Sequence, residues 1–396
     1  MAWGPAGTLG DVLRYLTAGE SHGQALVTIV EGLPAGLAVT VEDLQGELAR
    51  RRLGYGRGPR MRFEADEVTL VGGVRHGRTL GSPVAIEVKN SEWFRSDKWH
   101  AEMSPAPGAT ASPLTQPRPG HADLAGMQKY GFGDARDVLE RASARETAAR
   151  VAAGTLAKLL LAELGIQVVS HVIQMGPART KSTARPTVAD LERVDASPVR
   201  CFDPAAEEAM VEQVEAASKV GDSLGGIVEV IAYGVPVGLG SHVHWDRKLD
   251  ALLAQAVMSI QAVKGVEVGD GFEVAGRRGS AAHDPVTWSD DDGYERTSNL
   301  SGGVEGGIST GEPVIARVAM KPLATLNRPT LKTVDVVTKA ETVSFKERTD
   351  VTAVPAMGVV AETMVALVLA GEALRKFGGD SMAELVRNRD GFVAGL

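Results

Sequence analysis

Apolar residues recur along the chain with the two spacings typical of half-buried strands and amphipathic helices. Short apolar runs between Gly, Pro and polar residues predict strands at residues 13–18, 25–30, 68–71, 84–88, 168–173 and 227–232. Spacings of i, i+3 and i+4 predict helices at residues 40–52, 143–165, 204–218, 249–263 and 359–376. The last of these is apolar nearly all round, which is typical of a central helix.

Three stretches lack both periods. Residues 89–117 and 273–298 are polar and are predicted to be long loops. Residues 1–11 are Gly-rich and are predicted to be a frayed extension. Since strand hairpins and long helices do not alternate strictly, we expect an α+β fold in which a central helical layer lies between antiparallel β-sheets.

The sequence contains two short internal repeats. Residues 32–37 (GLPAGL) match 234–239 (GVPVGL), and residues 72–84 match 302–314 through the skeleton G-G-V-x-x-G-x-x-x-G-x-P-V. Chance similarity between Gly/Pro turns is the alternative, but two matches in one order favour duplication. We therefore expect a pseudo-two-fold within a single domain, residues 12–396, with halves at about 12–165 and 220–377.

Composition narrows the class of protein. The 396 residues are 44% hydrophobic and 23% charged, and the net charge of −8 argues against a nucleic-acid binder. The single cysteine, Cys201, excludes an intrachain disulfide and a multi-cysteine metal site, and we interpret it as a buried apolar residue. The longest apolar run is interrupted by Glu362 and Thr363. We therefore expect no membrane span, no metal site and a cytoplasmic location.

The stretch at residues 118–154 carries the densest candidate chemistry. Ser143 and Glu146 form a capping-box pattern at a predicted helix start. Arg141 and Arg145 flank that start, where unpaired N–H groups and the helix dipole favour an anion. The alternative is that Ser143 is only a cap and that the arginines are only solvated.

A second basic segment lies at residues 50–62, where six arginines fall within thirteen residues of an acidic protein. Glycines between them suggest a mobile anion-binding loop, with a solvated basic patch as the alternative. His22 and His121 lie in loops bracketed by Gly or Pro, so neither is expected on an apolar face. Imidazole groups titrate near neutral pH and can act as acids beside a phosphate.

No dinucleotide fingerprint, Walker loop, H-E-x-x-H or G-x-S-x-G motif accompanies these residues. Five ordered motifs instead occur along the chain: GESHG at 19–23, RPGHAD at 118–123, RASARET at 141–147, QAVKGVE at 261–267 and GGVEGG at 302–307. In these motifs the chain resembles the chorismate synthase family, from about residue 14 to residue 379.

The resemblance implies a fold, a reaction and a cofactor. The family fold places helices between antiparallel sheets and assembles as a homotetramer. The reaction removes phosphate and a ring proton from 5-enolpyruvylshikimate-3-phosphate by 1,4-elimination, giving chorismate at the end of the shikimate pathway. It requires reduced FMN although no net redox change occurs, and NADPH is relevant where members reduce their own flavin.

The resemblance also implies residue roles. The implied acids and bases are His22, His121 and Asp350. The implied substrate arginines are Arg51, Arg57, Arg60, Arg118 and Arg145, of which the first two are also pyridine-nucleotide contacts. The implied flavin contacts are Arg141, Ala142, Ser143, Gln261, Ala262, Gly306, Lys321, Pro322, Leu323, Ala324, Thr325 and Arg348.

Three positions depart from the family pattern. Thr349 stands where many members have His, Gln261 replaces a frequent Asn, and residues 1–11 extend beyond the usual start. Two other functions remain open at this stage: an FMN- or NADP-linked reductase, and a basic-loop module that binds phosphoanions or RNA. Several arginines are nevertheless what an acidic protein needs to bind a substrate with two carboxylates and a phosphate.

Overall fold

A computed structural model describes residues 12–58, 66–108, 112–290, 293–345 and 349–396. Two antiparallel sheets are its largest strand layers. The first has the order β1 (Arg14–Ala18), β2 (Ala25–Glu31), β6 (Val84–Lys89), β3 (Val68–Gly72). The second has the order β10 (Val263–Val268), β15 (Val314–Met320), β9 (Gly226–Tyr233), β7 (Gln167–Met175), β8 (Ala178–Arg179).

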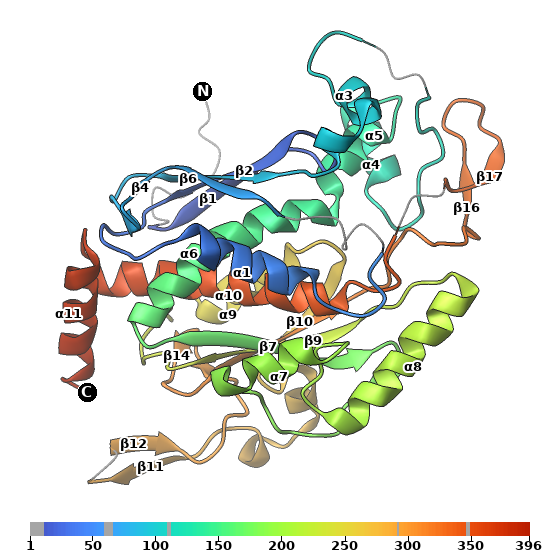
Figure 1. Ribbon diagram of the computed structural model, residues 1–396. Helices are drawn as coiled ribbons and strands as arrows, with labels where there is room; N and C mark the ends of the chain where they lie inside the picture. The colour runs from blue at the N-terminus through green and yellow to red at the C-terminus, as the bar shows by residue number, and fades with distance from the viewer. Residues whose placement is uncertain (1–11, 59–65, 109–111, 291–292, 346–348) are drawn as a thin grey trace.

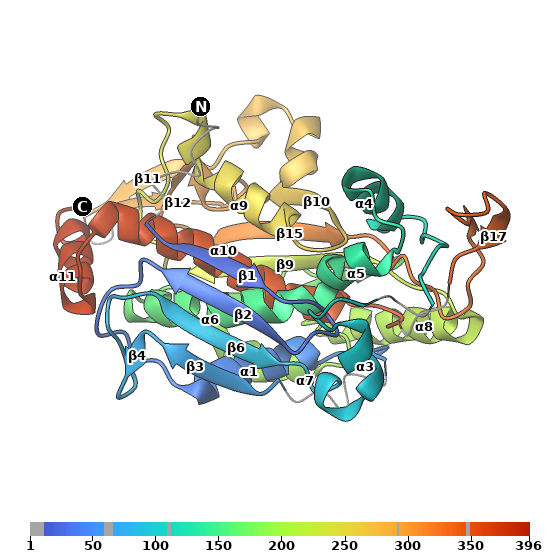
Figure 2. The same cartoon turned by 90° about the horizontal axis from the view of Figure 1, so that it is seen from above.

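Helices lie between these sheets (Figures 1 and 2). α6 (Thr147–Glu163) packs on β2, and α10 (Val354–Phe377) packs on β7 and β9. α1 (Val41–Arg52) and α9 (Leu249–Met258) also contact α10. The prediction of an α+β fold with antiparallel sheets is confirmed.

α10 is the central helix that the sequence predicted, and it begins five residues earlier than expected, at Val354. Within the described residues it is the one helix long and apolar enough to cross a membrane, but 89% of its apolar window is buried inside the protein. That burial is typical of a core helix. α6 packs directly against it, and a Cβ added at Gly154 would lie 2.3 Å from the Cβ of Thr363. The small residues of α6 therefore allow this close approach.

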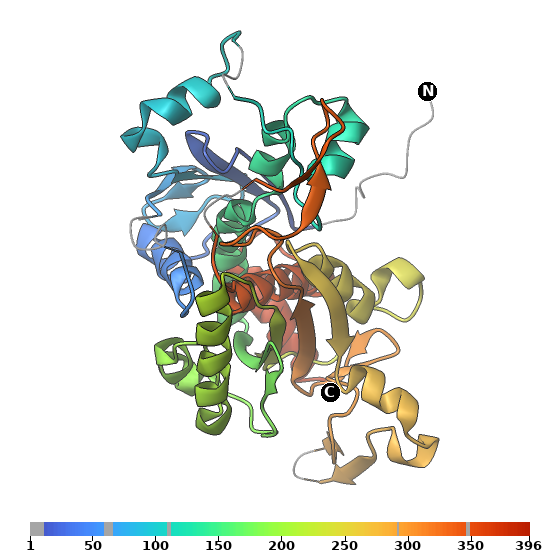
Figure 3. The same cartoon turned by 90° about the vertical axis from the view of Figure 1, so that its right-hand side faces the viewer.

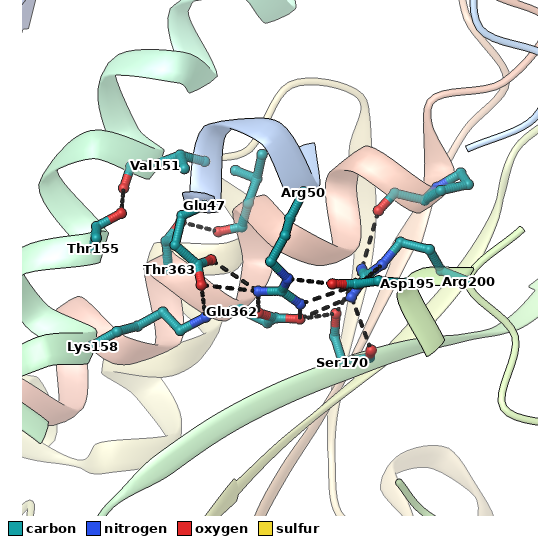
Figure 4. Close-up of polar contacts among 12 residues, drawn as sticks. Glu47, Arg50, Val151, Thr155, Lys158, Ser170, Asp195, Arg200, Glu362 and Thr363 are labelled. Atoms are coloured by element: carbon teal, nitrogen blue, oxygen red, sulfur yellow. Dashed lines mark hydrogen bonds and ion pairs between the residues drawn. The ribbon is translucent and has the colours of Figure 1, made fainter. Parts of the chain in front are cut away.

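A buried cluster of charges ties the helical layer to the second sheet (Figure 4). Glu362 of α10 is fully buried and accepts from Arg50 at 2.7 Å, Lys158 at 3.1 Å and Arg200 at 3.2 Å, while Ser170 of β7 donates to it at 2.7 Å. Burial alone would raise the pKa of Glu362, but the three cations hold it well below its ordinary value. Arg50, counted above in the basic segment at residues 50–62, thus has acidic partners, of which Glu362 is buried.

The segments that repeat in the sequence also form the same local structure. Residues 72–84 contain the hairpin β4 (Val74–Arg75) and β5 (Arg78–Thr79), and residues 302–314 contain β13 (Val304–Glu305) and β14 (Ile308–Ser309). The Thr79 hydroxyl accepts from Leu37 N–H and donates to Pro34 O, at 2.9 and 2.6 Å. The Ser309 hydroxyl makes the matching bonds, to Leu239 N–H and Pro236 O, at 2.8 and 2.6 Å.

Strand order repeats as well. The order β1-β2-β6-β3 in the first sheet corresponds to β7-β9-β15-β10 in the second. α1 follows β2 as α9 follows β9, and α6 follows the first set of strands as α10 follows the second. The strand that corresponds to β1 is thus β7, which begins at residue 167. The second half was expected to begin later, at about residue 220.

Several local predictions were wrong. The helix predicted over 249–263 ends at Met258, and Val263 begins β10. The loop predicted at 89–117 contains η1 (Trp93–Arg95) and α3 (Asp97–Glu102), and that at 273–298 contains η6 (Gly279–Ala281), β11 (Val286–Ser289) and β12 (Gly293–Arg296). Elements this short give too few residues for a recognisable period.

The capping box predicted at Ser143 and Glu146 also does not form. α5 (Arg136–Ala142) precedes Ser143, whose hydroxyl accepts from Arg145 N–H at the start of η2 (Ala144–Glu146). The Glu146 carboxylate instead accepts from Thr17, at 2.8 Å, and from Gln261, at 3.0 Å. Long-range partners therefore outcompete the local cap.

Other elements surround this core. Figure 3 shows the hairpin of β16 (Lys332–Val334) and β17 (Glu341–Val343) beside the segment that leads to α4 (Asp123–Tyr130) and α5. Thr115 of that segment donates to Asp335 of the hairpin at 2.6 Å. The elements are α4 (Asp123–Tyr130), η3 (Val188–Asp190), α7 (Leu191–Ala196), α8 (Pro204–Val220), η4 (Trp245–Arg247), η5 (Gly271–Gly276), β16 (Lys332–Val334), β17 (Glu341–Val343) and α11 (Met382–Val393).

Cys201 was interpreted as a buried apolar residue, and its position agrees. The residue is 4% exposed, and burial raises the pKa of its thiol to about 11. A thiol that stays protonated at neutral pH is a poor nucleophile.

Candidate active site

A cavity of about 310 Å³ opens where the ends of α1, α9 and β15 meet the starts of α6 and α10. One wall is apolar and comes from the first turns of α10, and the other walls carry imidazole, guanidinium and carboxylate groups. The lining includes Ser21, His22, Arg51, Arg57, Gly58, Trp99, Arg118, His121, Ala142, Ser143, Arg145, Gln261, Ala262, Met320, Leu323, Ala324, Thr325, Thr349, Asp350, Ala353, Ala356, Met357 and Val360.

His22 enters from the loop after β1 and is held on two sides. Its Nδ1 lies 2.9 and 3.0 Å from the two carboxylate oxygens of Glu140, in α5. Its ring stacks on Trp99, with centroids 3.8 Å apart and planes inclined by 17°. Burial would raise the pKa of Glu140, but hydrogen bonds and charge attraction from His22, with help from Arg136, lower it instead.

His121 enters from the loop before α4 and has a similar partner. Its Nδ1 is hydrogen-bonded to Asp123, a fully buried carboxylate. Asp123 also accepts from Arg118, whose Nε lies 2.8 Å away and whose Nη1 donates to Thr325 at 2.9 Å. Burial would raise the pKa of Asp123, but the bonds from His121 and Arg118 hold it well below its usual range.

Asp350 lies four residues before α10, on a loop held against the arginine segment. Its Oδ1 accepts from the Gly58 N–H at 2.6 Å, and its Oδ2 lies 3.3 Å from Nε of Arg57. Arg348, two residues before Asp350, falls outside the described residues. Arg57 and Gly58 therefore fix this carboxylate at the cavity wall.

Arginines supply most of the positive charge of the cavity. Arg51 is 5% exposed and donates to the Thr147 hydroxyl at 2.9 Å. Arg145 is also 5% exposed, and it donates to Asp66 at 2.5 Å and to Asn90 at 2.8 Å. These side chains are held by neutral and acidic partners, so their charges are fixed in place before any anion binds.

Gln261 and Ala262 close the side beside α9. Ala262 has a positive φ of 66°, a left-handed conformation that non-glycine residues adopt uncommonly, and its carbonyl accepts from the Lys321 N–H at 3.0 Å. The Gln261 amide donates to Glu146, while its oxygen is buried with no hydrogen-bond partner among the described residues. A buried acceptor of this kind is an opening for a donor on a ligand.

Comparison with known proteins identifies the family. The family model for chorismate synthase matches residues 13–374. The chain is 60% identical to the chorismate synthase of Salinispora tropica over 394 residues, covering 97% of this chain and 99% of the relative. It is equally identical to that of Thermobifida fusca over 395 residues, with the same coverage of both chains.

The chain belongs to the chorismate synthase family.

A solved structure extends the likeness to three dimensions. The crystal structure of a chorismate synthase matches with a TM-score of 0.77 at 40% identity, covering 97% of this chain and 98% of that one. The family and the chorismate synthase activity that the five motifs implied are thus confirmed, and so is the chorismate synthase fold.

The structure brings most of the implied chorismate synthase site residues to one cavity. All three implied acids and bases line it, as do four of the five substrate arginines. The implied flavin contacts that line it are Ala142, Ser143, Gln261, Ala262, Leu323, Ala324 and Thr325. Arg60 and Arg348 lie outside the described residues.

Four implied flavin contacts do not line this cavity. Arg141 turns away to Thr17 and Gly19, with bonds of 2.8 and 3.0 Å to their carbonyl oxygens. Gly306 lies in the turn between β13 and β14, where an added Cβ would meet nothing within 4 Å. Lys321 donates to Gly120 O, and Pro322 follows it. Contacts between these four residues and a flavin would therefore lie outside the cavity that a single copy of the chain forms.

Sequence reasoning missed three side chains that shape the chorismate synthase cavity. Trp99 lies in the stretch predicted to be a loop, Glu140 lies in a helix that was not predicted, and Asp123 was quoted in a motif without a role. Each of the three contacts one of the two motif histidines in the structure. Only Asp123, two residues after His121, could have been found from the sequence alone.

Among the described residues, no cluster of three or more His, Cys, Asp or Glu side chains could hold a metal ion.

Proposed function

We propose that this cavity is where the chain converts 5-enolpyruvylshikimate-3-phosphate to chorismate and phosphate. The observation that carries the proposal is convergence. His22, His121 and Asp350 line one cavity with four arginines, although His22 and Asp350 are 328 positions apart in the sequence (350 − 22). A 1,4-elimination needs groups that move protons and a positive site for the leaving phosphate. The cavity supplies both.

The arginines bind the substrate anions and the histidines act on the leaving group. Arg51, Arg57, Arg118 and Arg145 neutralise the two carboxylates and the phosphate, a role for which guanidinium groups are suited. His22 and His121 act as acids, and Asp350 takes up or returns a proton. Because Asp350 is held by Gly58, its carboxylate keeps a fixed position during the reaction.

The cavity also suits reduced FMN, which the family requires. Ala353, Ala356, Met357 and Val360 make an apolar wall against which a flat ring could lie. The buried oxygen of Gln261, which accepts no hydrogen bond from the part of the chain that the structure describes, could accept one from a ring N–H, and Ser143 and Thr325 offer hydroxyl groups. When bound, reduced FMN supplies electron density to the substrate without a net redox change. Asp350 would lie beside it and hold or move a proton.

An anaerobic assay tests the proposal. The chain is mixed with 5-enolpyruvylshikimate-3-phosphate and dithionite-reduced FMN, and chorismate and phosphate are measured. We expect equimolar products with FMN unconsumed. FMN consumed in step with substrate would instead favour a reductase, and substrate binding without turnover would favour a phosphoanion-binding module. Repeating the assay with oxidised FMN and NADPH tests whether the chain reduces its own flavin and binds NADPH.

We also propose the family homotetramer and an ancient duplication of the chain. The outer face of the first sheet exposes Leu16 (70%), Ile29 (44%) and Val27 (39%), an apolar face that an assembly would cover. Light scattering on the purified protein measures the assembly directly.

The proposed duplication is supported by the matching strand orders of the two sheets and by the matching hydrogen bonds of the Thr79 and Ser309 hydroxyl groups. The cytoplasmic location stays a prediction.

A further inference from the structure

Both motif histidines share a feature that the motifs do not reveal. Each pairs Nδ1 with a buried carboxylate, Glu140 for His22 and Asp123 for His121, and each carboxylate also accepts from an arginine. The Arg136 Nη1 reaches Glu140 at 2.9 Å. A carboxylate on one ring nitrogen decides which tautomer an imidazole adopts and which nitrogen faces a reactant.

Glu140 is held too firmly to be a passing contact. Its side chain is 3% exposed, it accepts from the backbone N–H of His22 at 2.9 Å, and its own carbonyl accepts from Ser21 N–H at 3.0 Å. The same carboxylate therefore fixes both the backbone and the ring of His22. α5 carries Glu140 directly into the Arg141–Ala142–Ser143 segment that borders the cavity.

Further side chains lie beside the His22 ring, from Trp99 and Glu92. Trp99 covers a face of the imidazole, and Arg136 lies over the Trp99 ring at 5.2 Å. Glu92 is a further charged neighbour, with Oε2 3.5 Å from Nε2 of His22. Since Nδ1 is engaged by Glu140, Nε2 is the atom through which His22 can exchange a proton with a ligand.

We propose that Glu140 is a positioning residue for His22. It holds the tautomer with hydrogen on Nδ1 and directs Nε2 toward the leaving phosphate. The inference rests on the proposed role of His22 as an acid. In the proton transfer, Nε2–H of the imidazolium gives its proton to a phosphate oxygen as the C–O bond breaks. The ring is left neutral with Nδ1–H on Glu140, so Glu140 itself takes no proton.

Glu140 tests this idea more cleanly than Asp123, because Asp123 also binds the substrate arginine Arg118. Glu140→Gln keeps the shape and can still accept the backbone N–H, but its amide can also donate to Nδ1 and so favour the wrong tautomer. Asp137→Asn is the matched control, since it removes one negative charge from the exposed side of the same helix.

The experiment measures single-turnover phosphate release with pre-reduced FMN across pH for the wild type, E140Q, H22A, E140Q/H22A and D137N. We expect E140Q to lower the rate by at least about tenfold with substrate affinity nearly unchanged, as for wrong-tautomer variants of other carboxylate–histidine pairs. The fall in activity on the alkaline side should move to lower pH, because a neighbouring carboxylate favours the charged form of an imidazole and E140Q removes that charge. D137N should match the wild type.

The double variant separates positioning from structure. If Glu140 acts through His22, E140Q/H22A should be no slower than H22A. Additive losses would show that Glu140 acts elsewhere, and an E140Q rate and pH profile equal to the wild type would overturn the inference while H22A still tests His22. A wild-type rate in H22A would instead remove the proposed role of His22.

A measurement on the wild type alone covers the case in which E140Q does not fold. Nitrogen-15 NMR of labelled histidine, with H22A for assignment, reports which ring nitrogen of neutral His22 carries hydrogen. We expect hydrogen on Nδ1. Hydrogen mainly on Nε2 would overturn the inference without bearing on substrate turnover.

Discussion

At the scale of single residues, the site is built from charges whose partners are already in place. Arg57 shows this best, since its side chain is 9% exposed and faces Asp350. The cavity thus holds acidic and basic groups in contact before substrate arrives. Electrostatic groups arranged in advance need little reorganisation during a reaction.

Arg57→Ala should weaken substrate binding. Each lost charge-assisted contact is worth roughly 1.5–3 kcal/mol, or about 10- to 150-fold in the dissociation constant. The loss should shrink as salt is raised, because ions screen the remaining charges. Titration at two salt concentrations checks this, with Arg387→Ala as control since Arg387 is exposed on α11 beyond the far end of α10. Unchanged affinity in R57A would show that Arg57 does not bind the substrate.

Asp350→Asn should keep reduced-FMN binding and lower turnover by at least about 100-fold, because the amide keeps the shape but cannot exchange a proton. Single-turnover phosphate release with pre-reduced FMN measures the step without limits from flavin supply. Asp246→Asn, at an exposed position outside the cavity, is the control. Release at the wild-type rate in D350N would make Asp350 a structural residue.

The sequence predicted the residues of the site better than their surroundings. Two motifs gave His22 and His121, the family resemblance added Asp350, and all three line the cavity. They could not give Glu140, because its partner lies 118 positions away and only the fold brings the two together. Trp99 was missed for the same reason. Gly306 and Arg141 show the reverse, since each carries an implied role and neither lines the cavity.

At the scale of elements, close contact between α6 and α10 organises the helical layer. Gly154 and Thr363 meet where the two helices pack, and no side chain larger than hydrogen fits at position 154. The central helix and the small-residue face of α6 were both predictable, because each is long and periodic. α3, α5 and the β11–β12 hairpin were not, because they are short and their positions depend on distant contacts.

Gly154→Ala should therefore destabilise the protein by about 1–3 kcal/mol, the usual cost of overpacking. Gly46→Ala is the matched control, because Gly46 lies on the exposed face of α1, where no described residue comes within 4 Å of an added Cβ. There alanine should stabilise by about 0.5–1 kcal/mol through helix propensity. Denaturant unfolding of both variants measures the difference. Equal effects would mean that α6 and α10 are not in tight contact.

The buried charge cluster predicts an acid-sensitive element of stability. The pKa of Glu362 is depressed in the folded protein, so its contribution is present above its ordinary value of 4.5 and is lost as pH falls below it. Glu362→Gln should cost about 3–5 kcal/mol at neutral pH, since it leaves Arg50, Lys158 and Arg200 without their shared anion. The gap to the wild type should narrow in acid. Unfolding from pH 7 to pH 3 tests this, with exposed Glu208→Gln as control. A gap independent of pH would contradict it.

At the scale of the whole molecule, the arrangement of the two sheets around the helical layer explains where the site lies. Two sheets of matching strand order enclose α6 and α10, and the cavity opens at the starts of both helices. Residues 51–58, 118–121, 260–262 and 349–350 reach it from both halves. Neither half alone would assemble the acids, the arginines and the apolar wall.

The central claim is that this cavity binds the substrate and the flavin together. The most direct measurement is a crystal structure of the protein with oxidised FMN and 5-enolpyruvylshikimate-3-phosphate. The account predicts the flavin ring against Ala353–Val360 and beside Asp350, with the substrate anions on the arginines and the phosphate near Nε2 of His22. Both ligands bound away from His22, His121 and Asp350 would contradict it.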